Sequence, residues 1–88
     1  MAVGSSAETW VLAEMITHSH IWRGAGHSEA DARTALLAAW TLHRHAVVAQ
    51  HPQLAPTLPE AADLPTHFPI RFMAYACGGG YRDGERVV

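Results

Sequence analysis

Apolar residues recur every three to four positions between Ser28 and Gln50, which is the period of an amphipathic helix. At about 100° per residue they gather on one stripe, which consists of Ala32, Ala35, Leu36, Ala39, Trp40, His43, Ala46 and Val47. Ser28 is a typical N-cap residue, and Pro52 ends the helix because the residue before a proline disfavours helical geometry. The pattern predicts a helix over residues 28–50, and its alanines predict close packing against a sheet.

From Phe68 onward apolar and polar residues alternate, as in a strand that buries one face. Pro69 predicts an edge strand or a strand start, because proline cannot donate a hydrogen bond to a sheet ladder. Asp83-Gly84 is a typical two-residue hairpin turn. We therefore expect a C-terminal hairpin over residues 68–88.

The segment before the helix has two interpretations. Ser5 and Glu8 have capping-box spacing, which favours a helix. The apolar residues of 9–26 scatter around a helical wheel, however, whereas as two strands they form a hairpin that leads into the helix through Gly24-Ala25-Gly26. The hairpin also gives the C-terminal strands a sheet to join, since two strands alone are barely stable. We favour a hairpin over residues 9–26, after a flexible N-terminus over residues 1–8.

Prolines punctuate the segment between the helix and the C-terminal strands, at positions Pro52, Pro56, Pro59 and Pro65. They predict a stiff, extended connector over residues 51–67, with one short turn of helix at 59–64. A chain of 88 residues allows a single domain. The predicted fold is α+β, with a small, mostly antiparallel sheet of two hairpins packed against one long amphipathic helix.

Composition narrows the function classes. With 49% hydrophobic and 16% charged residues, the chain is too apolar to be disordered. Its net charge is −2 and its six basic residues, all arginine, are spread along the chain, which argues against nucleic acid as a partner. The single cysteine, the absence of a signal-peptide pattern and the absence of a membrane-length apolar run predict a cytoplasmic protein without a membrane partner.

Aromatic and arginine residues form a candidate partner-binding set, which consists of Trp10, Trp22, Arg23, Arg71 and Tyr75. Such side chains stack on bases or peptides, although core packing is the competing interpretation for the tryptophans. The negative net charge favours a protein partner over RNA. We predict a non-catalytic binding or interaction module that forms a homodimer through its sheet or aromatic surface.

Seven histidines are unusual for this length, and His18 and His20 form the best candidate metal pair. On a strand, residues two apart point to the same face, so both imidazoles would reach one ion such as zinc. The site needs a third ligand, for which His27 or Glu14 are candidates. The competing interpretation is two surface histidines at a hairpin turn. A small metal-binding protein is the first alternative function, and no other cofactor is predicted.

Two further residues are candidates for chemistry. His43 lies within the apolar stripe, where it is either a pH-sensitive buried base or an ordinary core histidine with a hydrogen bond. Cys77 precedes three glycines, and with His67 as its base it would be a thiol nucleophile. A strand-end cysteine is more often a small hydrophobic residue, so a thiol enzyme is the least favoured function.

The junction Gly24-Ala25-Gly26-His27-Ser28-Glu29-Ala30-Asp31-Ala32-Arg33 resembles the strand-to-helix junction of double-stranded-RNA-binding domains. That resemblance implies phosphate contacts after the serine, but Glu29 and Ala30 stand where the family has lysines. The same stretch is similar to the helix start of HicB-like antitoxins, with Gly26, Ser28, Asp31 and Ala32 in matching places. The resemblance to antitoxins implies a helix packed on a small sheet and a toxin as the partner. An antitoxin-like or RNA-associated regulator is therefore the second alternative function, while the architecture alone accounts for both resemblances.

Overall fold

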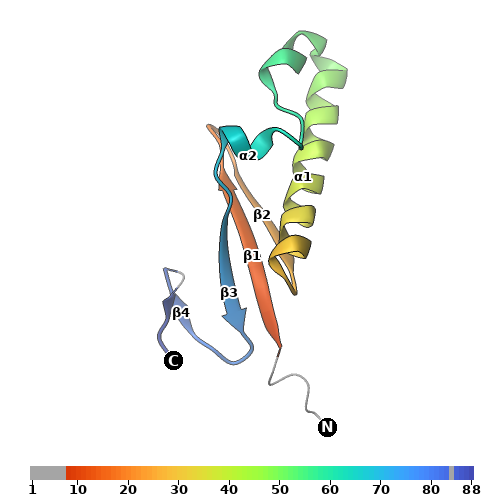
Figure 1. The fold of residues 1–88 in the computed structure, drawn as a ribbon. Helices are drawn as coiled ribbons and strands as arrows, with labels where there is room; N and C mark the ends of the chain where they lie inside the picture. Colours follow the sequence, from red (N-terminus) through yellow and green to blue (C-terminus); the bar gives the residue numbers. More distant parts are fainter. Residues whose placement is uncertain (1–7, 84) are drawn as a thin grey trace.

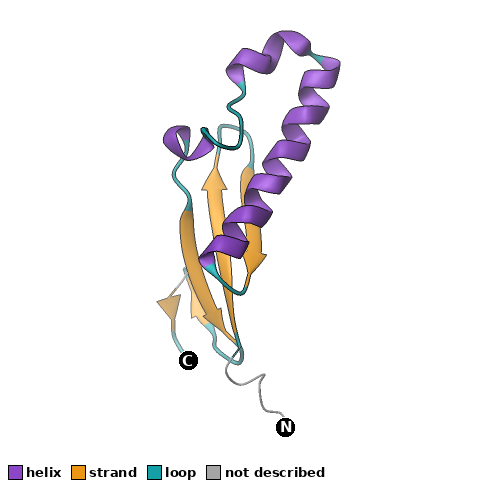
Figure 2. Cartoon of the chain, turned by 45° about the vertical axis from the view of Figure 1, so that its right-hand side comes forward, coloured by secondary structure: helices purple, strands orange, loops and turns teal. Residues whose placement is uncertain are grey.

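The computed structural model describes residues 8–83 and 85–88 (Figure 1). The elements in chain order are β1 (Thr9–Ile16), β2 (Ile21–Gly26), α1 (Glu29–Gln50), η2 (Pro52–Thr57), α2 (Leu64–His67), β3 (Arg71–Ala76), β4 (Tyr81–Arg82) and β5 (Glu85–Arg86). Strand β1 lies between β2 and β3 in a three-stranded antiparallel sheet, and α1 packs on one face of it (Figure 2). The predicted α+β fold, an antiparallel sheet against one long helix, is confirmed.

The N-terminal hairpin is confirmed as well. Strands β1 and β2 pair from Ile16↔Ile21 to Val11↔Gly26, and the Thr17 N–H donates to the His20 carbonyl across the turn (2.9 Å). The alternative helix is wrong for the residues of β1. Its cap residue Ser5 lies outside the described residues, as does most of the predicted flexible N-terminus.

The C-terminal strands differ in part from the prediction of one hairpin over residues 68–88. Strand β3 pairs with β1 and not with the strand that follows it, while β4 and β5 form a separate two-stranded hairpin. The separation begins at Gly78, whose φ of +85° turns the chain out of the sheet in a conformation that favours glycine. Asp83 has the left-handed φ of +53° that a tight turn requires, and its neighbour Gly84 lies outside the described residues.

Helix α1 begins as predicted. Ser28 is its N-cap, and the Ser28 Oγ accepts a hydrogen bond from the Asp31 N–H (3.1 Å). Its fully buried residues are Ala32, Leu36 and Trp40. The predicted stripe is too wide on one side, because its remaining alanines are exposed, namely Ala35, Ala39 and Ala46. Helix α1 packs mainly against β2, an edge strand, so the sheet covers only a narrow row of the helix.

Gly24 and Gly26 explain how closely α1 approaches the sheet. Both lie in β2, within the predicted hairpin, and both are buried. A Cβ atom at Gly24 would lie 2.2 Å from the Ala32 carbonyl oxygen and 2.4 Å from the Leu36 nitrogen. The strand glycines therefore provide the space in which the first half of the helix lies.

The predicted extended connector is wrong, because the segment folds back along the second half of α1 (Figure 2). It contains the 3₁₀-helix η2, and its turn of α-helix lies at Leu64–His67 and not at 59–64. The Trp40 indole N–H donates to the Pro59 carbonyl (2.8 Å), and Arg44 Nε donates to the Leu58 carbonyl (2.9 Å). Prolines prevent a regular helix, but these side-chain donors satisfy carbonyls in their place. Within the described part of the chain, no helix has the length and apolar character needed to cross a membrane.

Candidate functional site

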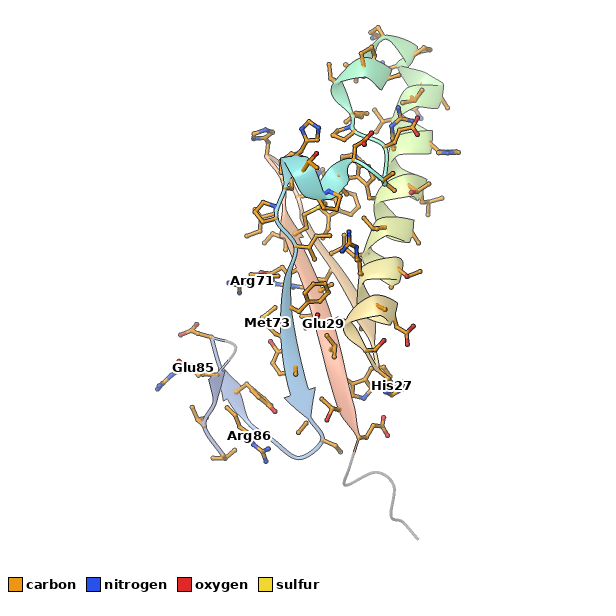
Figure 3. The ribbon with its side chains drawn as sticks, viewed as in Figure 1. His27, Glu29, Arg71, Met73, Glu85 and Arg86 are labelled. Carbon is orange, nitrogen blue, oxygen red and sulfur yellow. The ribbon has the colours of Figure 1, made fainter. Side chains whose placement is uncertain are left out.

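The sheet face opposite α1 has no helix packed over it in the described part of the chain (Figures 1 and 2). The strand register arranges its side chains in four rows: Ile16 with Ile21, Glu14 with Arg23 and Arg71, Leu12 with Ala25 and Met73, and Trp10 with Tyr75. Figure 3 labels Arg71 and Met73 on β3. We call this surface the open face.

Glu14 joins the two arginines of the second row. Its Oε2 lies 3.0 Å from Arg23 Nε and its Oε1 lies 3.0 Å from Arg71 Nε. The Glu14 side chain is 10% exposed, whereas those of Arg23 and Arg71 are 56% and 67% exposed. The row therefore has two exposed positive charges around one shielded negative charge. Because Glu14 holds both arginines, it is not placed as a metal ligand.

The aromatic row of the open face is partly solvent-exposed. Trp10 is 45% exposed, and its ring stacks on that of His27 with centroids 4.1 Å apart. Tyr75 contacts Tyr81 of β4 edge to face at 4.7 Å. The structure thus brings four members of the predicted binding set onto one face, namely Trp10, Arg23, Arg71 and Tyr75. Trp22 is the exception: it points to the helix side, where its ring lies 5.4 Å from that of Trp40.

A second feature is a cavity of about 650 Å³ on the helix side of the sheet, between the β1–β2 turn, α1 and the connector. Its wall includes four histidines from three separate segments, namely His18, His20, His43 and His67. Indole and phenyl rings of Trp22, Trp40 and Phe68 supply much of the apolar wall. We call it the histidine cavity.

The rings of the histidine cavity form two groups. The His43 ring lies 5.0 Å from Trp22, 5.5 Å from His20 and 5.9 Å from Trp40, measured between centroids. In the second group the Phe68 ring lies 5.8 Å from the His18 ring and 6.5 Å from the His67 ring. His43, the predicted pH-sensitive buried base, is half-buried. It therefore belongs to the wall of a cavity and not to the core.

Hydrogen bonds leave the imidazoles as the main nitrogen groups of the wall that are available to a ligand, beside the Asp63 carboxylate. Both indole N–H groups are satisfied internally, that of Trp22 by Thr17 Oγ1 (3.1 Å) and that of Trp40 by the Pro59 carbonyl. His20 Nδ1 lies 3.1 Å from Ser19 Oγ. Within the described residues, the other three histidine rings of the cavity make no hydrogen bond to the protein.

The predicted metal pair does not have the geometry assumed for it. His18 and His20 lie in the turn after β1 and not on a strand, and they face different neighbours, Phe68 and His43. Among the described residues no group of three His, Cys, Asp or Glu side chains is arranged to hold a metal ion. The candidate third ligand His27 stacks on Trp10 at the far end of β2.

The thiol pair fails on distance. Cys77 directly follows β3, whereas His67 precedes it, so the six residues of the strand separate them. A strand of that length spans roughly 20 Å. His67 therefore does not act as a base for Cys77.

Comparisons of the chain with family models, with curated proteins and with solved structures found no match. The open face and the histidine cavity are therefore the basis on which a function is inferred. Sequence patterns identified the aromatic and arginine residues of the open face and the histidines of the cavity, but missed the aliphatic rows and Glu14 as the centre of the arginine row. Its position opposite two arginines follows only from the strand register.

Proposed function

We propose that the protein is a non-catalytic binding module that forms a homodimer through its open face. The observation that supports this is a sheet face with no helix over it within the described residues, on which Trp10, Ile16 and Ile21 are exposed and only the Tyr75 end is contacted by Tyr81 of β4. Helix α1 covers only the other face of the sheet. Exposed apolar side chains grouped on one face are typical of an interaction surface, and here the charged row of Glu14, Arg23 and Arg71 runs between them.

The row order makes the open face complementary to itself. The Leu12–Met73 row lies midway between the arginine row and the Trp10–Tyr75 row, with neighbouring rows about 7 Å apart. A twofold axis along the middle row lays each strand over its own copy, so Arg71 of one copy would lie on the Tyr75 ring of the other and Arg23 beside the Trp10–His27 pair, twice per dimer. Arginine over an aromatic ring is attractive, and this offset keeps the two positive rows apart.

The thin core supports the same proposal. It has two alanines among the six buried hydrophobic residues that the structure describes, Ala13, Met15, Ala32, Leu36, Trp40 and Leu64. Association would add apolar burial that the monomer lacks.

Sedimentation equilibrium tests the dimer. We expect the wild type to be dimeric at micromolar concentration, and Trp10→Lys to raise the dissociation constant at least about tenfold, because it removes an aromatic ring and adds a positive charge opposite the partner's row of Glu14, Arg23 and Arg71, in which positive charge exceeds negative. Trp10→Ala, which adds no charge, should weaken the dimer less. The matched control is Leu42→Lys, the same type of change at a 75% exposed position on α1, and it should remain dimeric.

Far-UV circular dichroism confirms that each variant is folded before its mass is measured. A wild type that is monomeric at 100 µM refutes the proposal. The proposal is also refuted if Leu42→Lys is monomeric and Trp10→Lys remains dimeric, because that result would place the interface on the helix.

A further inference from the structure

We propose that the histidine cavity is a binding site for a small planar carboxylate, such as an aromatic acid. The volume of about 650 Å³ lies within the range of pockets that enclose small organic ligands. The cavity is separate from the open face, because its wall residue Trp22 points to the helix side of the sheet. The inference therefore does not depend on dimer formation.

The apolar wall determines the shape of the ligand. Trp22 and Trp40 meet nearly at right angles, with an interplanar angle of 75°, and Phe68 is a third aromatic residue of the wall. Because both indole N–H groups are bonded within the protein, these rings offer faces and edges but no donors. Such a wall favours a flat hydrocarbon body that packs on aromatic rings.

The imidazoles determine the charge of the ligand. Neutral imidazole offers one N–H donor and protonated imidazole offers two, and the change takes place between about pH 5 and 8. Four histidines face the cavity, and Asp63 is the one carboxylate in its wall among the described residues. Four imidazoles thus offer N–H donors to the cavity against a single carboxylate, so the site should accept an anion. Hydrogen bonds from charged donors to a carboxylate are among the strongest in proteins.

The other charged groups nearby do not alter this balance. Arg44 and Glu60 pair at 3.9 Å, and together with His45 they line a second, smaller cavity of about 250 Å³ on the other side of the connector. From α1, His43 is thus the titratable residue that faces the histidine cavity, whereas His45 faces away from it. The helix offers a matched pair of histidines for an experiment.

Benzoate is the probe, and isothermal titration calorimetry measures its affinity at pH 7.5 and pH 5.5. We expect saturable binding that is about tenfold tighter at pH 5.5, because protonated imidazoles bind the carboxylate. His43→Gln should weaken binding about tenfold at pH 5.5 and reduce its pH dependence, whereas His45→Gln should bind as the wild type does. His67→Gln, at an exposed position of the cavity wall, tests the site without a change near the core.

The comparison ligands are benzyl alcohol, benzyltrimethylammonium and Zn²⁺. Binding of the folded protein to benzyl alcohol as tight as to benzoate would refute the role of charge. Preference for the ammonium ion would show a cation site formed by the rings and Asp63, and stoichiometric Zn²⁺ without benzoate binding would show a metal site. Either result overturns the proposal, as does an equal loss of affinity in His45→Gln or no binding of benzoate at all.

Discussion

Gly24 lies in β2 directly beneath α1, and alanine at this position is the most informative single change in the fold. The backbone is not the obstacle, because Gly24 is outside the left-handed region that only glycine adopts readily. The obstacle is space: a Cβ atom would lie 2.2 Å from the Ala32 carbonyl oxygen and 2.4 Å from the Leu36 nitrogen. Both are backbone atoms of a helix, so no side-chain rotation relieves the overlap.

The structure sets the size of the effect. To restore ordinary contact distances, α1 must move away from β2 by about 1 Å. Such a shift loosens the packing of Leu36 and Trp40, two of the largest residues in a thin core. Overpacking of a core typically costs about 1–3 kcal/mol, and we expect about 2–3 kcal/mol for Gly24→Ala because the clash is with backbone.

Urea unfolding at one fixed protein concentration measures this cost. Tryptophan fluorescence is the observable, since the rings of Trp22 and Trp40 lie 5.4 Å apart in the core and separate on unfolding. If the free energy of unfolding falls by about 1 kcal/mol per molar urea, the urea concentration at the unfolding midpoint should fall by about 2–3 M. The control is Gly80→Ala, whose Cβ would meet only the movable side chain of Val88. A Gly24→Ala midpoint within about 0.5 M of the wild type would refute the steric argument.

Three further changes test other contacts. Ser28→Ala removes the cap acceptor of the Asp31 N–H and should lower the free energy of unfolding by about 1 kcal/mol in urea, whereas Ser28→Asp should not. Glu14→Gln leaves two exposed arginines without a counter-charge and should lower the free energy of unfolding by about 1 kcal/mol, and by less in high salt. An unchanged urea midpoint at low salt would contradict the ion-pair geometry. Exposed Cys77 should react with a thiol reagent in the native protein, at a rate that His67→Gln leaves unchanged.

The sequence predicted the elements that local patterns determine. The helix from Ser28 follows from periodicity and capping, which depend on neighbouring residues, and the N-terminal hairpin was favoured because residues 9–26 lack a helical period. The predicted helix stripe was too wide because its true width depends on how much of the sheet lies beneath it. Ala35 and Ala39 satisfy the helical period as well as Leu36 does, and only the position of β2 leaves them exposed.

The candidate site was less accessible to sequence reasoning, because it depends on contacts between distant segments. His18, His20 and His43 each stood out in the sequence, but no pattern placed His43 within 5.5 Å of His20 or His67 in the wall of the same cavity. The connector creates that cavity by folding back along α1, whereas its prolines had predicted an extended segment. Proline excludes regular structure but does not determine the direction of the chain.

Strand alternation determines how the two proposed surfaces relate to each other. Trp22 and Arg23 are neighbours in β2, yet one faces the histidine cavity and the other faces the open face, because successive side chains of a strand point to opposite sides. A ligand in the cavity therefore contacts the helix side of a strand whose other side would contact a second copy. The sheet between the two surfaces is a single layer, and α1 packs directly against the glycines of β2. The shift of α1 in Gly24→Ala would displace His43, whereas the rows of the open face would keep their register. Gly24→Ala protein that remains folded should thus lose affinity for benzoate before it loses the dimer, and the reverse order would mean that the two surfaces are coupled through the sheet.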